Sequence, residues 1–221
     1  MSRGLQQAAY LLAFDTRAQH PQDRARAGFL VRAAALAELA ERGAVAEDGR
    51  GRVRVVEAGT TGDALLDALL AEVGCAPRSW KAWIRRGRED TLEAVEERLA
   101  VLGVLTVADR DPYGAVVPRR PVVVDDPREA LDLQARVAGL VRGDGPPAGA
   151  PFADLVLAVL AAHGHLRLVL PRHDRRARSE RIAALTDELA ARLADRAPGL
   201  VRAMAGLNLT MVAAQGGMGG G

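Results

Sequence analysis

The chain has 221 residues, of which 49% are hydrophobic and 26% charged, so it can bury a sizeable core and is not a disordered segment. Only 3% of the residues are aromatic, and the abundant Ala, Leu and Val favour an aliphatic, mainly helical fold. The formal net charge of +2 is small for a DNA-binding domain, and the single cysteine, Cys75, excludes a disulfide within the chain.

The N-terminal part predicts a buried helix and a small hairpin. Residues 5–14 form a short apolar helix or strand, too short to span a membrane and without a signal-peptide cleavage site after it. The broad apolar surface of residues 23–42 indicates a helix that is buried on most sides and ends at Gly43. Turn signals between two β-favouring runs predict the hairpin at residues 44–56.

Two further helices follow. Thr60 is a candidate N-cap for a helix over residues 62–73, and Pro77 opens a short helix that contains Trp80 and Trp83. For Trp83, packing in the core is a better explanation than stacking on a ligand, because aromatic side chains commonly anchor cores. For Trp80, both interpretations remain open.

A longer helix leads into a second hairpin. Asp90 and Glu93 give the capping-box pattern for a helix that Gly103 stops. Between residues 104 and 124, β-branched runs flank a turn-prone Asp-Arg-Asp-Pro-Tyr-Gly segment, which predicts a protruding hairpin.

The sequence of the C-terminal half again predicts helices. Residues 126–129 supply the N-cap, first-turn proline and capping-box acid of a helix to about residue 142, and the apolar run 152–163 predicts a central core helix. Residues 175–193 are amphipathic, and Pro198 opens a last helix. We therefore predict a mainly α, single helical-bundle domain over residues 1–213.

The Gly-rich end, residues 214–221, is predicted to be a disordered tail. The arginine-rich segment 171–181, earlier in this half of the chain, has two interpretations. It could attract phosphate or an anionic membrane, but charge runs of this kind are more commonly solvated helix starts with paired charges.

Catalytic and metal chemistry find little support. His163 and His165 would point away from each other on a helix, and no Cys or acidic cluster completes a metal site. Cys75 has no local activating group, and we expect a small buried thiol. The phosphate-binding and hydrolase motifs built on glycine-rich turns are absent from the sequence. We predict neither an enzyme, nor a metal site, nor a cofactor.

Four stretches together resemble the Golgi phosphoprotein 3 family, and their order and spacing make the resemblance specific. They are Leu30-Val31-Arg32 with LAELAERGAV (36–45), TGDALLDALL (61–70), Ser79 to Ile84, and ERLAVLGVL (97–105). The resemblance extends over about residues 6–213. It implies a helical bundle with a β-hairpin used in self-association and a basic pocket that binds phosphatidylinositol 4-phosphate.

The resemblance also locates that pocket. Family members use a tryptophan and three arginines, and Arg32 stands at the position of one of these arginines. The tryptophan falls near Asp23, and the other two arginines fall near Glu89 and Leu92, so these three are not kept.

Substitute cations lie just upstream of the two missing arginines. Arg85, Arg86 and Arg88 could replace them, because a guanidinium can bind a phosphate bidentately from a different backbone position. The alternative is that these three arginines simply form a solvated surface.

We therefore expect a bacterial, cytoplasmic protein that is peripheral at the inner membrane face and binds an anionic, phosphoinositide-like lipid through Arg32, Arg85, Arg86 and Arg88. Homo-oligomers could form through the hairpin 104–124, although its DPYGAVVP segment has few bulky apolar side chains for membrane insertion. The main alternative is a protein-interaction adaptor or scaffold that has lost the lipid site. A nucleic-acid-associated regulator ranks below both.

Overall fold

The computed structural model describes residues 3–57, 59–107 and 122–216. The α-helices are α1 (Leu5–Ala13), α2 (Arg24–Glu41), α3 (Ala64–Cys75), α4 (Trp80–Arg85), α5 (Arg88–Val101), α6 (Pro127–Arg142), α7 (Phe152–His163), α8 (Arg172–Ala177), α9 (Ser179–Arg192), α10 (Pro198–Ala205) and α11 (Leu207–Gly216). The short strands are β1 (Phe14–Asp15), β2 (His20–Pro21), β3 (Val45–Glu47), β4 (Arg52–Val55), β5 (Arg78–Ser79), β6 (Leu105–Val107) and β7 (Val122–Val124), and a 3-10 turn, η1, covers Pro147–Gly149. The predicted mainly α class is confirmed.

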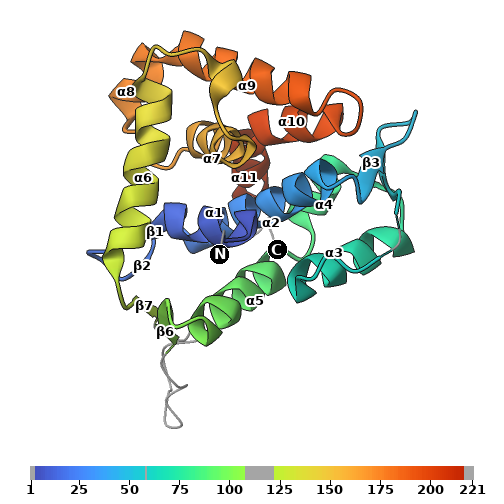
Figure 1. Ribbon diagram of the computed structural model, residues 1–221, viewed down its shortest axis with the longest axis horizontal. Helices are drawn as coiled ribbons and strands as arrows, with labels where there is room; N and C mark the ends of the chain where they lie inside the picture. The colour runs from blue at the N-terminus through green and yellow to red at the C-terminus, as the bar shows by residue number, and fades with distance from the viewer. Residues whose placement is uncertain (1–2, 58, 108–121, 217–221) are drawn as a thin grey trace.

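Helix α2 lies at the centre of the molecule, with α1, α4, α5 and α7 packed around it (Figure 1). Asp23 caps its N-terminus by accepting a hydrogen bond from the Arg26 backbone N–H at 3.0 Å, and Gly43 ends it with a φ of +74°. Every residue from Ala27 to Ala40 is buried, so the burial is more complete than the predicted burial on most sides. Its many alanines allow neighbouring helices to approach closely.

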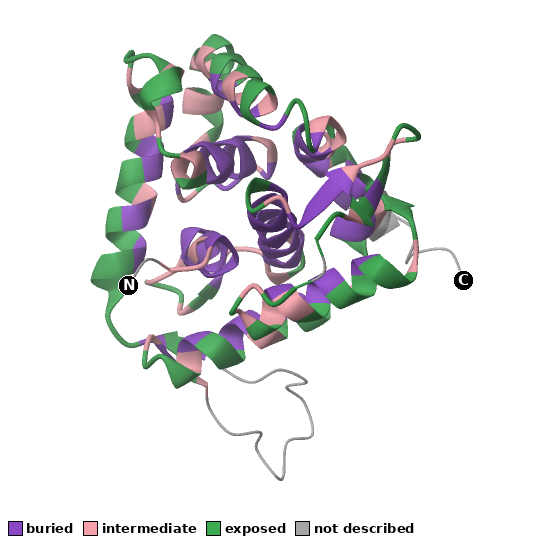
Figure 2. Cartoon of the chain, turned by 45° about the vertical axis from the view of Figure 1, so that its right-hand side comes forward, coloured by how far each residue is buried: buried purple, intermediate pink, exposed green. Residues whose placement is uncertain are grey.

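Helix α7 is the second buried helix and has the predicted bounds (Figure 2). Gly164 follows it at the point of contact with α2. A Cβ at this position would lie 2.5 Å from both Leu30 Cδ2 and the Leu160 carbonyl oxygen, so any other residue must displace the Leu30 side chain and the last turn of α7. One continuous cluster of buried apolar side chains runs from Leu5 to Met211 around these two helices.

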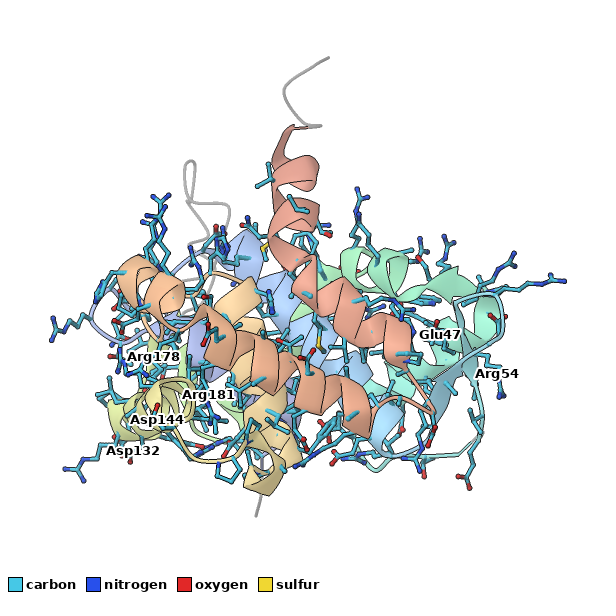
Figure 3. The ribbon with its side chains drawn as sticks, turned by 90° about the horizontal axis from the view of Figure 1, so that it is seen from above. Glu47, Arg54, Asp132, Asp144, Arg178 and Arg181 are labelled. Carbon is cyan, nitrogen blue, oxygen red and sulfur yellow. The ribbon has the colours of Figure 1, made fainter. Side chains whose placement is uncertain are left out.

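The predicted hairpin at residues 44–56 is present as β3 and β4, and β5 extends it to an antiparallel three-stranded sheet. Glu47 at the end of β3 joins this sheet to the helices. Its Oε2 accepts hydrogen bonds from Trp80 Nε1 at 2.8 Å and from the Gly199 backbone N–H at 2.6 Å (Figure 3). Trp80 and Trp83 are both 1% exposed. The predicted packing of Trp83 in the core is therefore confirmed, and Trp80, for which packing and ligand stacking were both open, also packs in the core.

The second hairpin is described only at its base. Strands β6 and β7 are antiparallel, with Leu105 opposite Val124 and Val107 opposite Val122. Its predicted tip, residues 108–121, lies outside the described residues. The Val124 backbone N–H donates to Gln19 Oε1 at 3.0 Å, which ties the hairpin base to the turn between β1 and β2.

Two predicted helix starts are wrong. Asp63, not Thr60, caps α3, accepting from the Leu65 and Leu66 backbone N–H groups at 2.9 and 3.2 Å. Helix α5 begins at Arg88, before the predicted cap at Asp90, because Gly87 adopts a left-handed φ of +61° and turns the chain there.

The C-terminal helices are more divided than predicted. The amphipathic stretch 175–193 is split into α8 and α9, because Arg178 leaves the helical conformation. The helix from Pro198 ends at Ala205, and α11 continues to Gly216, so residues 214–216 of the predicted disordered tail are helical. Residues 217–221 lie outside the described part of the chain.

Candidate functional site

Arg32, the arginine singled out by the family resemblance, points into the protein from α2. Its side chain is 2% exposed. The guanidinium donates to Glu72 Oε2 at 2.6 Å and to Thr91 Oγ1 at 2.8 Å, and Nε donates to the Trp83 carbonyl at 3.3 Å. Arg32 therefore links α2 to α3, α4 and α5, and each of its three side-chain nitrogens already has one acceptor.

The turn between α4 and α5 covers this guanidinium. A Cβ on Gly87 would lie 3.4 Å from Arg32 Cζ, and Thr91 Oγ1 donates to the Gly87 carbonyl at 2.7 Å. The positive φ of Gly87 and its closeness to Arg32 both favour glycine here. Arg32 thus lies directly beneath the segment that carries Arg85, Arg86 and Arg88.

The three substitute cations differ in their surroundings. Arg85 and Arg86 are exposed, and neither side chain makes an ion pair or hydrogen bond within the described residues. Arg88 is held in place: its guanidinium lies 4.9 Å from the centre of the Phe29 ring and donates to the Arg85 carbonyl and to Glu89 Oε1, each at 3.1 Å. Two exposed cations and one cation held by its neighbours therefore lie on the turn that covers the buried Arg32.

A cavity of about 500 Å³ opens beside Arg32, between α3 and α5. Its charged lining consists of Arg32, Arg98, Asp63, Glu72 and Asp90. Carboxylates outnumber arginines, so the cavity as it stands does not present an excess of positive charge to a phosphate. The Glu72 carboxylate occupies the acceptor position that an anionic ligand of Arg32 would need.

The other pocket positions implied by the resemblance serve the fold. Asp23 caps α2, Glu89 is 74% exposed and pairs with Arg88, and Leu92 is buried in the core. The structure does not gather these three positions into an anion-binding group with Arg32.

Sequence reasoning missed the residues that surround Arg32. Glu72 and Thr91 come from two different helices, and nothing in their local sequence marks them as partners of an arginine. Gly87 could have been found, because a glycine between arginines at a helix boundary is a signal for a left-handed turn.

The remaining candidates show no catalytic arrangement. Cys75 is exposed at the end of α3, so the expected buried thiol is wrong. His163 Nε2 lies 3.2 Å from Thr186 Oγ1, and burial lowers the pKa of His163. Within residues 3–57, 59–107 and 122–216, no group of three His, Cys, Asp or Glu side chains could hold a metal ion.

The fold is a mainly helical bundle that carries small antiparallel sheets and a hairpin base, and comparison with known families identifies it more closely. The family model described as Golgi phosphoprotein 3 (GPP34) matches residues 5–204. The chain belongs to this family, which is a non-catalytic family of peripheral, lipid-binding proteins. Among curated proteins, none matches the chain. In the part of the chain that the structure describes, no helix has both the length and the apolar character needed to cross a membrane.

Proposed function

We propose that this protein is a peripheral membrane domain that binds anionic lipid headgroups of the phosphoinositide type. The observation that carries the proposal is membership of the Golgi phosphoprotein 3 family over residues 5–204. The site is the turn that carries Arg85, Arg86 and Arg88, together with Arg32 beneath it. The site faces the cytoplasmic side of a membrane, where anionic lipids are exposed.

Binding proceeds in two electrostatic steps. Arg85 and Arg86 are exposed and attract the anionic surface, with about 1 kcal/mol from each basic side chain near it. A phosphate then reaches Arg32 only by displacing the Glu72 carboxylate, whose side chain is 44% exposed and free to swing into solvent. This competition makes headgroup affinity weaker than in a site whose arginine has no internal partner.

A second function is favoured by the carboxylates of the cavity. Asp63, Glu72 and Asp90 outnumber the two arginines there and suit a cationic segment of another protein. This observation supports the alternative of a protein-interaction adaptor.

Co-sedimentation with vesicles tests the lipid proposal. The vesicles contain neutral lipid alone or with phosphatidylinositol, phosphatidylinositol 4-phosphate or another anionic lipid, each at low and moderate salt. We expect selective binding to the inositol lipids that weakens with salt. The double variant Arg85→Gln/Arg86→Gln should bind about 30-fold more weakly, since two cations of about 1 kcal/mol each are removed.

The matched control is Arg50→Gln/Arg54→Gln. Both residues are exposed on the hairpin of β3 and β4, and Figure 3 shows Arg54 at the edge of the molecule. This variant has the same net charge and should retain binding. Absence of binding to every vesicle at low salt would contradict the lipid proposal and favour the adaptor, and equal binding to all anionic vesicles would remove the phosphoinositide preference.

A further inference from the structure

A second cavity, of about 460 Å³, lies where the start of α2, the turn after α7, and α8 meet. Its charged and titratable lining residues are Asp23, Arg26, His165, Arg167, Arg172 and Arg175. It shares no lining residue with the cavity beside Arg32. It also lies outside the four sequence stretches that carry the family resemblance, and Asp23, near the place of the family's pocket tryptophan, is the one position that this cavity and the family's pocket have in common.

The positive charge of this cavity is not balanced by its single acid. Asp23 is engaged by its own helix, since it accepts from the Arg26 backbone N–H at 3.0 Å and lies 3.5 Å from Arg26 Nε. The side chains of Arg167, Arg172 and Arg175 make no ion pair or hydrogen bond with any described residue. Four guanidinium groups thus line the cavity with one carboxylate among them.

The other arginines of segment 171–181 behave differently. Arg178 pairs with Asp144 at 3.4 Å, and Arg181 donates to the Leu140 and Gly145 carbonyls, at 3.2 and 2.6 Å (Figure 3). Asp174 forms an ion pair with Arg142 at 2.8 Å. The paired-charge interpretation therefore holds for the start of α9, whereas the arginines of α8 that face the cavity lack such partners among the described residues.

The cavity cations also influence one another. Burial lowers the pKa of Arg175, and the charges of Arg172, Arg176, Arg167 and Arg26 lower it further. Burial likewise lowers the pKa of His165, and among neighbouring groups Arg175 and Arg26 contribute most. Besides burial, both shifts reflect the positive potential of the neighbouring arginines, which an anion would neutralise.

The backbone at His165 adds an independent observation. His165 follows the C-cap of α7 with a left-handed φ of +55°, a position that helices usually fill with glycine. The segment is held by the Arg167 backbone N–H, which donates to Gln22 Oε1 at 3.1 Å, and by Arg26, which donates to the Gly164 carbonyl at 2.5 Å. A side chain is thus kept at a strained position that borders the cavity.

We propose that this cavity binds a phosphate monoester. Arg167, Arg172 and Arg175 donate to the phosphate oxygens, because guanidinium groups match phosphate geometry bidentately, and His165 borders the same space. The cavity volume falls in the range of small-molecule sites and exceeds what a single phosphate group fills, so the ligand is an organic phosphate. Its source is either a lipid headgroup or a soluble metabolite of the same chemistry.

Calorimetric titration of the full chain with glycerol 3-phosphate at low salt tests the proposal. The double variant Arg172→Gln/Arg175→Gln should bind at least about tenfold more weakly, because charge-assisted hydrogen bonds are lost. Arg176→Gln is the control, because Arg176 is an exposed residue of the same helix and does not line the cavity. The affinity of this variant for glycerol 3-phosphate should change little. Equal affinity in the parent and the double variant, or no binding by the parent, overturns the proposal.

Thermal unfolding without ligand separates binding from folding. If the cluster serves a ligand, Arg172→Gln/Arg175→Gln relieves repulsion and leaves the melting temperature unchanged or higher. His165→Gly should raise the melting temperature, because glycine suits the left-handed position, while binding weakens. A melting temperature lowered in both of these variants would assign the cluster to the fold and overturn the proposal.

Vesicles identify the source of the phosphate. Phosphatidic acid carries a phosphate monoester, and phosphatidylglycerol carries only a diester. Preference for phosphatidic acid that is lost in Arg172→Gln/Arg175→Gln and retained in Arg85→Gln/Arg86→Gln supports a lipid headgroup. Binding of glycerol 3-phosphate without this preference supports a soluble ligand, and loss of binding only in the Arg85/Arg86 variant overturns the cavity proposal while leaving the proposed function intact.

Discussion

At the scale of single residues, Arg32 and Glu72 form an ion pair whose two side chains differ in burial. Arg32 is 2% exposed, whereas Glu72 is 44% exposed, so only the arginine depends on its partner for charge compensation. Thr91 and the Trp83 carbonyl supply neutral acceptors that cannot replace an anion. Glu72 therefore acts both as a stabilising counter-ion and as a competitor for any phosphate that approaches Arg32.

Glu72→Gln should separate these two roles. We expect the free energy of unfolding to fall by about 1–2 kcal/mol, because a buried arginine loses its only anionic partner among the described residues while an amide oxygen still accepts a hydrogen bond. Affinity for anionic vesicles should rise, since the competing carboxylate is gone. Urea unfolding and co-sedimentation measure the two effects.

Glu89→Gln is the control for this prediction. Glu89 pairs with Arg88 at 3.1 Å but is 74% exposed, so its removal should change the free energy of unfolding by well under about 1 kcal/mol. A variant at Glu72 that loses stability without gaining vesicle affinity would count against a lipid site at Arg32.

At the scale of secondary-structure elements, the contact between α2 and α7 depends on Gly164. The Cβ of any other residue would overlap Leu30 on α2 and the carbonyl of Leu160 on α7. Both helices are nearly fully buried at this point, so neither can move without opening the core.

Gly164→Ala should therefore destabilise the protein by about 1–3 kcal/mol, as overpacked cores do. Gly139→Ala is the matched control, because Gly139 is exposed within α6 and a Cβ there meets no atom within 4 Å. The control should stabilise the protein by about 0.5–1 kcal/mol through helix propensity. Urea unfolding measures both, and equal effects would show that Gly164 is not a packing constraint.

At the scale of the whole molecule, a buried polar group joins three helices. Tyr10 of α1 donates to Glu96 Oε1 of α5 at 3.0 Å, and Arg24 of α2 forms an ion pair with the same carboxylate. Burial raises the pKa of Tyr10 far above its usual range, and the charge of Glu96 raises it further. The neutral phenol is therefore the form that the folded state requires.

This requirement predicts alkaline instability. The pKa of Tyr10 is raised on folding, so its contribution to stability is complete below the unfolded pKa of about 10 and is lost as the pH rises above it. The free energy of unfolding should fall by about 1.4 kcal/mol per pH unit above that point. Tyr10→Phe should cost about 1–2 kcal/mol at pH 7 but remove this slope. Urea unfolding at several pH values between 8 and 12 measures this slope in the parent protein and in Tyr10→Phe. Identical slopes in the two proteins would refute the assignment of the alkaline instability to Tyr10.

Local signals predicted the helical framework well. Asp126 and Pro127 marked the start of α6, and the apolar run 152–163 gave the bounds of α7. The prediction failed at two helix boundaries: Gly87 packs on Arg32 where α5 begins, and Arg178 leaves the helical conformation between α8 and α9. The antiparallel base of the second hairpin is confirmed, and its tip stays a prediction.

The sequence by itself determined the helical class, most element positions and the family, because capping and periodicity act within a few residues along the chain. Only the tertiary structure decided which charges are neutralised. Arginines look alike in the sequence, yet Arg32 is buried against Glu72, while Arg26, Arg167, Arg172 and Arg175 come from three segments to line one cavity. Charge compensation depends on which helices pack together, and that information is not local.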